Sequence, residues 1–334
     1  MTKHADKSIS IPSPFRSVRA GGWAFSVMSL ISLVLVLRNA DIAIRHMTYG
    51  LRLCVTSVIP SLFPFMVLSE LIVSTGAVRL VGRLLARPFG ALFHIGRESA
   101  CALLLGLLCG FPVGTRCALS LYQQGVIGRE ELSRLLCFSN IPSSAFLIST
   151  VGTSLFGDHS FGVLLYAITV LSALLLGILI ARAPQNKKRA QTPSVPFDSP
   201  TPRKGKSGVS AFTDAIGSSA LSMLHICAFV VFFSVLAGAL EHLLQGISLA
   251  PPLSALLFGF FELTGGVARA STLSLPISEL LCAFFVGWSG ISVHCQCMSL
   301  CSLPEISFRP YLLAKLAHGI LNVLLLLLFR GILP

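Results

Sequence analysis

The chain has 334 residues, of which 54% are hydrophobic and only 11% are charged, and its net charge is +12. Charged residues make up about a quarter of a typical soluble domain, so this composition excludes an ordinary soluble protein. The apolar residues form long runs rather than one helical stripe, which indicates helices that face lipid. The basic residues stand in short blocks without interleaved aromatic residues, so they indicate membrane topology rather than nucleic-acid binding. We therefore predict an all-α polytopic membrane protein whose partner is the lipid bilayer.

The chain begins with a basic segment and an apolar run. Residues 1–22 are polar and basic, and we expect them in the cytoplasm. Residues 23–38 could alone be a secretory signal, but the many apolar runs that follow favour an uncleaved first transmembrane helix. The next apolar run, 55–73, contains Pro60 and Pro64, which predict a kinked span. The arginines after it, at positions 79, 83, 87 and 97, indicate the cytoplasmic side.

The stretch 106–116 joins a helical run to residues that break a helix. We predict a third span at 99–110. Gly110, Pro112 and Gly114 then interrupt the helical pattern, because glycine lowers helix stability and proline lacks a backbone donor. Unpaired peptide groups at membrane depth are tolerated only beside protein or a water-filled cavity. The break is therefore a candidate for the wall of a cavity.

A second copy of this stretch occupies 259–269. Aligned without gaps, Gly106 matches Gly259 and Arg116 matches Arg269. Interrupted helices at corresponding points of two halves are the pattern that marks the binding site of many secondary transporters. The sequence therefore predicts two repeats with a site between their helix breaks.

Residues 135–156 form an apolar run whose centre, 139–144, is polar and contains a proline. We predict a re-entrant hairpin there rather than a span. A span at 161–180 closes the first repeat, 55–181, and the basic linker 182–210 is predicted to be disordered and cytoplasmic. Because a re-entrant hairpin leaves the linker inside, the second repeat begins on the opposite side from the first. The two repeats are then inverted.

The second repeat, 211–330, follows the same plan. A span at 211–240 precedes the second break. Residues 280–300 carry a polar centre like that of 135–156, and a span at 311–329 closes the chain. The predicted architecture is thus two inverted repeats with broken helices and re-entrant hairpins, preceded by one extra N-terminal transmembrane helix.

Arg116 and Arg269 are the leading candidates for a substrate site. A guanidinium within a membrane needs a cavity or a partner, and it pairs bidentately with a carboxylate. The alternative is that both side chains reach the lipid headgroups. Glu262 lies deeper in its apolar run, where a carboxylate could be a counter-ion, a proton carrier or a cation ligand, or a structural partner of Arg269.

The other candidates for substrate contact sit at the helix breaks and polar centres, and hydrogen bonding between these segments is the alternative explanation. No zinc pair of histidines, nucleophile elbow or phosphate-binding loop is present in the sequence, so we expect neither an enzyme nor a cofactor. The cysteines at 295, 297 and 301 beside His294 could suggest a metal, but packing of small residues between helices explains them without one. The candidates are Gly110, Pro112, Gly114, Asn140, Ser143, Gly265, Ser289, His294 and Gln296.

Four motifs, in the same order, make the chain similar to a known family. They are Gly-Phe-Pro-Val-Gly at 110–114, Val-Gly-Thr-Ser-Leu-Phe-Gly at 151–157, Phe-Glu-Leu-Thr-Gly at 261–265 and Gly-Ile-Ser-Val-His-Cys-Gln at 290–296. With them the chain resembles the YlbJ family of sporulation integral membrane proteins, which contain the nucleoside-recognition or Gate domain. One departure lies at 140–145, where Asn-Ile-Pro-Ser-Ser-Ala replaces the Asn-x-Ser-Gly-Pro expected of the family.

The resemblance implies a protein of endospore-forming bacteria that is made in the mother cell and lies in the cell membrane or the outer forespore membrane. It also implies the movement of dipicolinate, a flat aromatic dianion, toward the spore. Three hypotheses stay open: a carrier of a small organic anion such as dipicolinate, a carrier of a nucleoside or other neutral solute, and a non-transporting sporulation scaffold. Accessory sporulation proteins and a homo-oligomer also stay open as partners.

Overall fold

The computed structural model describes residues 20–74, 87–123, 125–183, 208–244, 249–300 and 308–332. This part of the chain is helical and contains no strand. Five of its helices are long and apolar enough to cross a membrane, or six if a bent pair counts as one span. The prediction of an all-α polytopic membrane protein is confirmed. Residues 1–19 of the basic N-terminal segment, 184–207 of the linker, Arg79, Arg83 and Cys301 lie outside the described residues.

The first half begins with a helix and then one long element. These are α1 (Ala20–Arg38), followed by α2 (Ala40–Leu53), the π-helix η1 (Cys54–Val58) and α3 (Ile59–Ser74). The long element starts earlier than the predicted run 55–73, because α2 is helical although its sequence mixes apolar and charged residues. The wide turn of η1 ends just before Pro60, which has no backbone N–H to donate.

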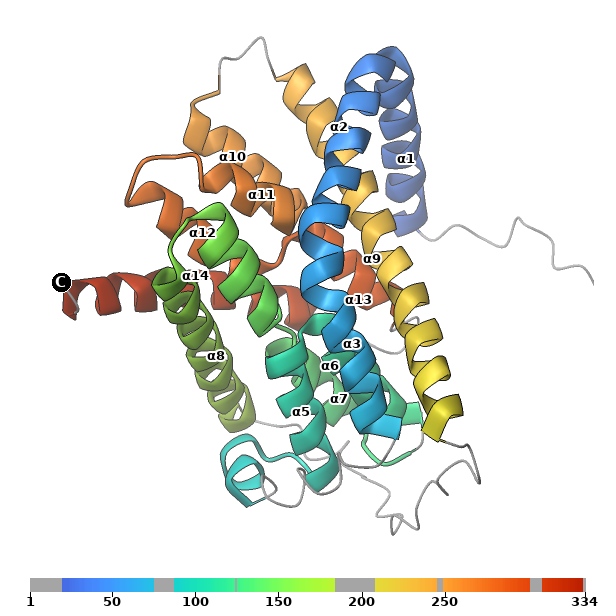
Figure 1. The fold of residues 1–334 in the computed structure, drawn as a ribbon, viewed down its shortest axis with the longest axis vertical. Helices are drawn as coiled ribbons and strands as arrows, with labels where there is room; N and C mark the ends of the chain where they lie inside the picture. Colours follow the sequence, from blue (N-terminus) through green and yellow to red (C-terminus); the bar gives the residue numbers. More distant parts are fainter. Residues whose placement is uncertain are drawn as a thin grey trace, which may run out of the picture.

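Helix α9 (Gly208–Leu243) opens the second half and packs antiparallel to the α2–α3 element (Figure 1). Gly238 of α9 lies against the ring of His46, where an added Cβ would be 2.2 Å from the ring. Further along α2 and η1, the thiol of Cys54 donates to the carbonyl of Cys227 at 3.8 Å. The residue number on α9 falls as that on α2 rises, so these corresponding elements run in opposite directions. This is the relation expected of inverted repeats.

The first helix break forms a re-entrant hairpin. Helix α5 (Arg97–Cys109) ends at Gly110, which has a φ of +94°, and α6 (Phe111–Gln123) folds back along α5. A Cβ added to Gly114 would lie 2.6 Å from the Cα of Gly106, so only glycines allow this approach. The 13 residues of α5 span about 20 Å, which is short for a hydrocarbon core of about 30 Å. The structure thus has a hairpin where the sequence predicted a third span.

The second break has the same form. Helix α10 (Pro251–Phe261) ends at Glu262, and α11 (Leu263–Ala270) folds back along α10. Here a Cβ added to Gly266 would lie only 2.1 Å from the Cα of Gly259. Each half therefore contains one tightly packed hairpin whose two helices touch through a glycine pair.

The polar centres interrupt two further elements, which do not fold back. Helices α12 and α13 together form one candidate span, and α7 and η2 do not pack along each other as α5 and α6 do. The re-entrant hairpin predicted at 135–156 is thus found at the glycine-rich break instead. If α7 and η2 together cross the membrane in place of the predicted third span, the number of crossings before the linker is unchanged and the charge argument for the side of the linker still applies. The elements are α7 (Arg129–Ser139), η2 (Phe146–Leu155), α12 (Ile277–Trp288) and α13 (Gly290–Leu300).

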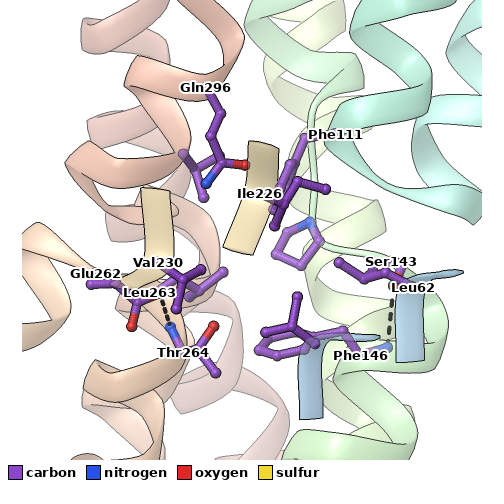
Figure 2. Close-up of a pocket in the computed structure, with 13 residues that line it drawn as sticks. Leu62, Phe111, Ser143, Phe146, Ile226, Val230, Glu262, Leu263, Thr264 and Gln296 are labelled. Carbon is purple, nitrogen blue, oxygen red and sulfur yellow. Dashed lines mark hydrogen bonds between the residues drawn. The ribbon is translucent and has the colours of Figure 1, made fainter. Parts of the chain in front are cut away.

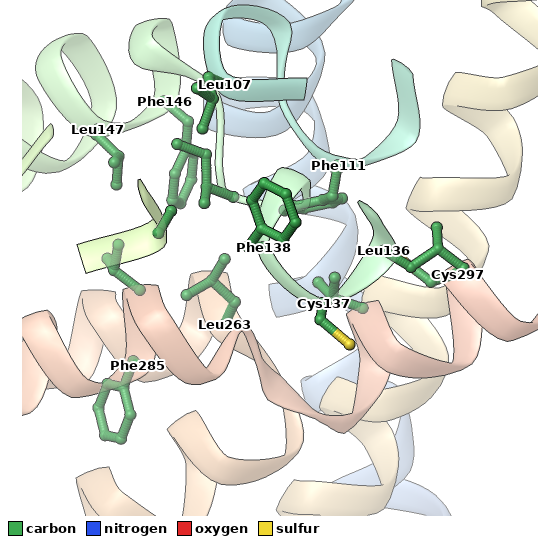
Figure 3. Close-up of a cluster of buried hydrophobic side chains, with 14 of the residues drawn as sticks. Leu107, Phe111, Leu136, Cys137, Phe138, Phe146, Leu147, Leu263, Phe285 and Cys297 are labelled. Atoms are coloured by element: carbon green, nitrogen blue, oxygen red, sulfur yellow. The ribbon is translucent and has the colours of Figure 1, made fainter. Parts of the chain in front are cut away.

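Helices α8 (His159–Arg182) and α14 (Phe308–Ile332) close the two halves. Helix α14 packs on α12 of its own half and on α7 and α8 of the other. One apolar cluster continues across the junction, with Phe138 and Leu147 from the first half and Phe285 from the second (Figure 3). The helix breaks of both halves are thereby held in a common core.

Candidate functional site

A small cavity lies where the two halves meet, as Figure 2 shows. Its volume is about 30 Å³, enough for roughly two water molecules. An apolar cavity with a few convergent polar groups is the usual form of a ligand site, although a larger solute requires the walls to separate. The lining consists of Val58, Leu62, Phe111, Pro142, Ser143, Phe146, Ile226, Val230, Glu262, Leu263, Thr264, Val293 and Gln296. We call this space the central cavity.

The carbonyl groups freed by the two breaks are satisfied in the same way in both halves. In the first half, the Ser144 hydroxyl donates to the carbonyl oxygen of Leu108, near the end of α5, at 3.1 Å. In the second, the indole N–H of Trp288 donates to the carbonyl oxygen of Phe260, near the end of α10, at 3.0 Å. Each hairpin tip is therefore tied to the interrupted element of its own half, which removes part of the cost of a break at membrane depth.

Backbone also meets backbone closely at the tips. A Cβ added to Gly110 would lie 2.9 Å from the amide nitrogen of Ser143, and one added to Gly290 would lie 3.0 Å from that of Leu263. Ser289, just before Gly290, has a φ of +73°, a conformation that is uncommon for a residue other than glycine. Gly110 and Ser289 thus shape the tips, and the structure shows neither in the lining of the cavity.

Glu262 caps the second half of its own hairpin. Glu262 is 1% exposed. One of its carboxylate oxygens accepts a hydrogen bond from the amide of Thr264 at 2.9 Å (Figure 2), and the other accepts one from the amide of Gly265 at 2.5 Å. A helix N-terminus favours an anion, and here the protein supplies that anion itself. The α11 terminus is therefore already occupied, and Glu262 is bonded to backbone rather than to Arg269.

Arg116 faces a second cavity beside the first. Phe111, Ile226 and Gln296 line both cavities and so form the partition between them. The second cavity is also lined by Arg116, Ser222, His225, Phe229, Cys297, Ser299 and Leu300, and we call it the arginine cavity. Among the residues that the structure describes, no carboxylate forms an ion pair with Arg116.

Gln296 presents an unused acceptor at the partition. Its amide nitrogen donates to the hydroxyl of Ser292 at 3.3 Å, whereas its Oε1 is buried without a partner in the described part of the chain. A buried acceptor without a donor is costly. A solute that entered with a hydroxyl, an amide or a protonated carboxyl group could supply that donor.

Arg269 lies outside both cavities. Its guanidinium contacts Glu241 through two bonds of 2.7 and 2.9 Å and Ser254 at 3.1 Å, and it stacks on Phe258 at 3.6 Å from the ring centroid. Arg116 and Arg269 differ in this way because they stand at different distances from their helix breaks, which the gapless alignment does not take into account. Arg116 follows its break at Gly110 by six residues, whereas Arg269 follows Glu262 by seven. One residue turns a helix by about 100°, so the two side chains point in different directions.

The structure reveals a buried lysine that sequence reasoning missed. Lys315 of α14 is fully buried, and its ammonium group donates to the carbonyl oxygen of Asn140 at the end of α7. The side chain of Asn140 in turn accepts from the Thr115 hydroxyl at 2.9 Å. A cation is favourable at the C-terminus of a helix. Lys315, which belongs to the second half, therefore stabilises the end of α7 in the first half. An ionisable residue in the apolar run 311–329 was the signal for it.

The remaining predicted residues are placed around these groups. His294 bonds through Nδ1 to the Tyr311 hydroxyl at 3.2 Å, away from both cavities. Pro112 stands in the first turn of α6. Gly114 packs against Gly106 within the hairpin, and the amide of Gly265 donates to the Glu262 carboxylate. The structure therefore brings Ser143, Glu262 and Gln296 together in the central cavity, with Arg116 next to it.

These features define a polytopic all-α membrane protein of two inverted halves, with a cavity between their helix breaks. Over 305 residues the chain is 29% identical to the sporulation integral membrane protein YlbJ of Bacillus subtilis (strain 168), which covers 81% of this chain and 73% of that protein. This similarity supports the YlbJ family of sporulation integral membrane proteins, in agreement with the resemblance in the motifs of the chain. No protein-family profile and no solved structure matches it.

Proposed function

We propose that the protein carries a small organic anion across its membrane, and that this anion is dipicolinate moving toward the forespore during endospore formation. The membrane is then the cell membrane or the outer forespore membrane. In this proposal the protein is a carrier rather than an enzyme and works without a cofactor. Accessory sporulation proteins or a second copy of the chain would assist it.

The observation that carries the proposal is the state of Arg116. A cation at membrane depth is costly unless it has a partner or faces water, and Arg116 faces a cavity with no carboxylate paired to it among the described residues. An anion from solution supplies the missing partner, and guanidinium binds carboxylates bidentately. Dipicolinate carries two carboxylates that could pair with the guanidinium. Its flat aromatic ring is compatible with the apolar side chains of the central cavity.

The proposed entry side follows from the linker. If the basic linker is cytoplasmic, α9 starts on that side, and Ser222 and His225 of the arginine cavity lie nearer its start than Val230 of the central cavity. The arginine cavity is then the vestibule on the cytoplasmic side. An anion would meet Arg116 first and pass the partition of Phe111, Ile226 and Gln296 to reach the central cavity.

One observation favours a neutral solute as the second candidate. The lining of the central cavity contains no cation, and its polar groups are Ser143, Glu262, Thr264 and Gln296. Such groups suit the hydroxyl and amide groups of a nucleoside better than a dianion. Competition by unlabelled nucleosides and dicarboxylates for the same uptake distinguishes the two candidates.

The test is uptake of labelled dipicolinate by proteoliposomes that contain the purified full chain. We expect saturable uptake that Arg116→Ala abolishes and Arg116→Lys retains in part, because lysine keeps the charge but not the bidentate geometry. Arg309→Ala, at an exposed arginine at the start of α14, is the matched control and should transport normally. Undiminished uptake by a folded Arg116→Ala variant, or no uptake by the folded wild type, would overturn the proposal.

A further inference from the structure

The ion pair of Arg269 joins two parts of the molecule that pack mainly within themselves. Glu241 stands near the end of α9, which packs along α2 and α3, and we call these elements the long-helix pair. Arg269 stands on α11, in the assembly of hairpins and interrupted helices that we call the hairpin body. The central cavity lies on the boundary between them, because the long-helix pair supplies Val58, Leu62, Ile226 and Val230 to its lining.

The inverted repeat provides a counterpart for this ion pair. Arg116 is the cation of the first hairpin as Arg269 is of the second. The counterpart of α9 is the α2–α3 element, and Glu70 lies in the last two turns of α3, as Glu241 lies in the last turn of α9. Both carboxylates therefore stand near the C-terminal end of a long helix that runs antiparallel to the other.

Glu70 is also close to the helix that carries Arg116. Helix α3 packs against α6, and the Glu70 carboxylate lies within electrostatic range of Cys117, the residue next to Arg116. Arg116 and Glu70 nevertheless form no ion pair with each other in the described chain, whereas Arg269 and Glu241 form a bidentate one. Each half thus provides an arginine and a glutamate, but the ion pair is formed only in the second half of the described chain.

We propose that Glu70 and Glu241 are gating residues, each of which forms an ion pair with the arginine of its own hairpin in one of two alternating positions of the hairpin body. In the position described here the Arg269–Glu241 pair is closed and Arg116 is open to its cavity. Movement of the hairpin body along the long-helix pair breaks the first pair and brings Arg116 to Glu70. The inference deepens the proposed function, since it assigns the residues that would open the site to each side in turn.

This assignment explains why Arg116 can be a substrate ligand without being a permanently unpaired charge. In the open position the arginine is available to an anion. In the other position Glu70 replaces the anion, so the guanidinium has a partner there without a solute. Each position then contains one arginine–glutamate pair, so the two positions can be close in free energy, which a carrier needs if both are to be populated.

The test is carbodiimide cross-linking, which joins a carboxylate to an amine in direct contact and requires no substrate. The full chain is prepared with Arg116→Lys and Arg269→Lys together, so that each hairpin has an amine in place of its guanidinium. Peptide mass spectrometry then looks for cross-links 269–241 and 116–70. We expect both, with the second lost in Glu70→Gln and increased in Glu241→Gln.

Cross-link 269–241 serves as the internal control, because that contact exists in the position described here. If it forms and 116–70 does not, the Arg269–Glu241 pair is a fixed structural bridge and the proposal fails. If neither forms in folded protein, the proposal fails as well. Because the cross-linking experiment uses no solute, a failure of dipicolinate uptake alone would overturn the proposed substrate but not the assignment of Glu70 and Glu241 as gating residues.

Discussion

The two hairpins have the same backbone design and opposite electrostatics. In the α5–α6 hairpin the break residue is Gly110, which has no side chain, and the nearby Arg116 faces a cavity without an ion-pair partner among the described residues. In the α10–α11 hairpin the break residue is Glu262, which caps the following helix, and Arg269 is bound to Glu241. The arginine of the second hairpin is thus neutralised by a carboxylate of α9, whereas the arginine of the first has no such partner among the described residues.

The comparison shows that a helix break and the side chains near it have separate roles. Both breaks satisfy the same backbone requirement, through Ser144 in one half and Trp288 in the other. Only the first leaves a cation free to act on a solute. When two repeats share one backbone plan, the repeat that keeps an unpaired charged group is therefore the better guide to the chemistry of the ligand.

The largest expected effect concerns the glycine contacts within the hairpins. Gly266→Ala places a Cβ 2.1 Å from the Cα of Gly259, and Gly114→Ala places one 2.6 Å from the Cα of Gly106. Because backbone meets backbone, the helices must separate, and overpacking of this kind costs about 3 kcal/mol. We expect a loss of thermal stability in detergent for both variants, larger for Gly266→Ala.

The control for these substitutions is Gly217→Ala in α9, where an added Cβ meets nothing within 4 Å. Alanine favours a helix over glycine by about 1 kcal/mol, so this variant should be at least as stable as the wild type. If Gly266→Ala were equally harmless, the close approach of α10 and α11 would not hold.

The positions of the breaks could be predicted from the sequence, because glycine and proline act locally. Gly110, Pro112 and Gly114 cannot continue an apolar helix without loss, and the second copy at 259–269 indicated the matching point. What happens after a break depends on contacts across the fold. The re-entrant form of α5 and α6 rests on the pairing of Gly106 with Gly114, which periodicity does not reveal.

The partners of charged residues were the hardest part of the site to predict. Arg269 binds Glu241, 28 residues away, and the nearer Glu262 turns back to its own backbone. Lys315 could have been found, since Tyr311, Lys315, His318 and Asn322 fall on one face of a helix and all four are buried. Its contact with Asn140, 175 residues away, comes only from tertiary packing.

A smaller effect is expected from the cap that distinguishes the second hairpin. Glu262→Ala removes both acceptors from the amides of Thr264 and Gly265, which should cost about 2 kcal/mol. Glu262→Gln keeps one acceptor and should cost less. Amide hydrogen exchange in the first turn of α11 should accelerate in this order, while the first turn of α6, which has no such cap, stays unchanged. Equal exchange in all three proteins would contradict the capping role.

The smallest expected effect concerns the ion pair itself. The Arg269 and Glu241 side chains are 29% and 25% exposed, so solvent screens their interaction, and pairs of this kind contribute about 0.5 to 1 kcal/mol. We expect Glu241→Gln to lower the thermal midpoint by a few degrees at low salt and by less at high salt. Glu70→Gln removes a carboxylate at the corresponding place in the other half, where no ion pair is formed within the described residues, and should leave the midpoint unchanged. If Glu241→Gln and Glu70→Gln lowered the thermal midpoint equally, the Arg269–Glu241 and Arg116–Glu70 pairs would both be formed at the same time. The two hairpins would then differ in sequence but not in whether their ion pair is formed.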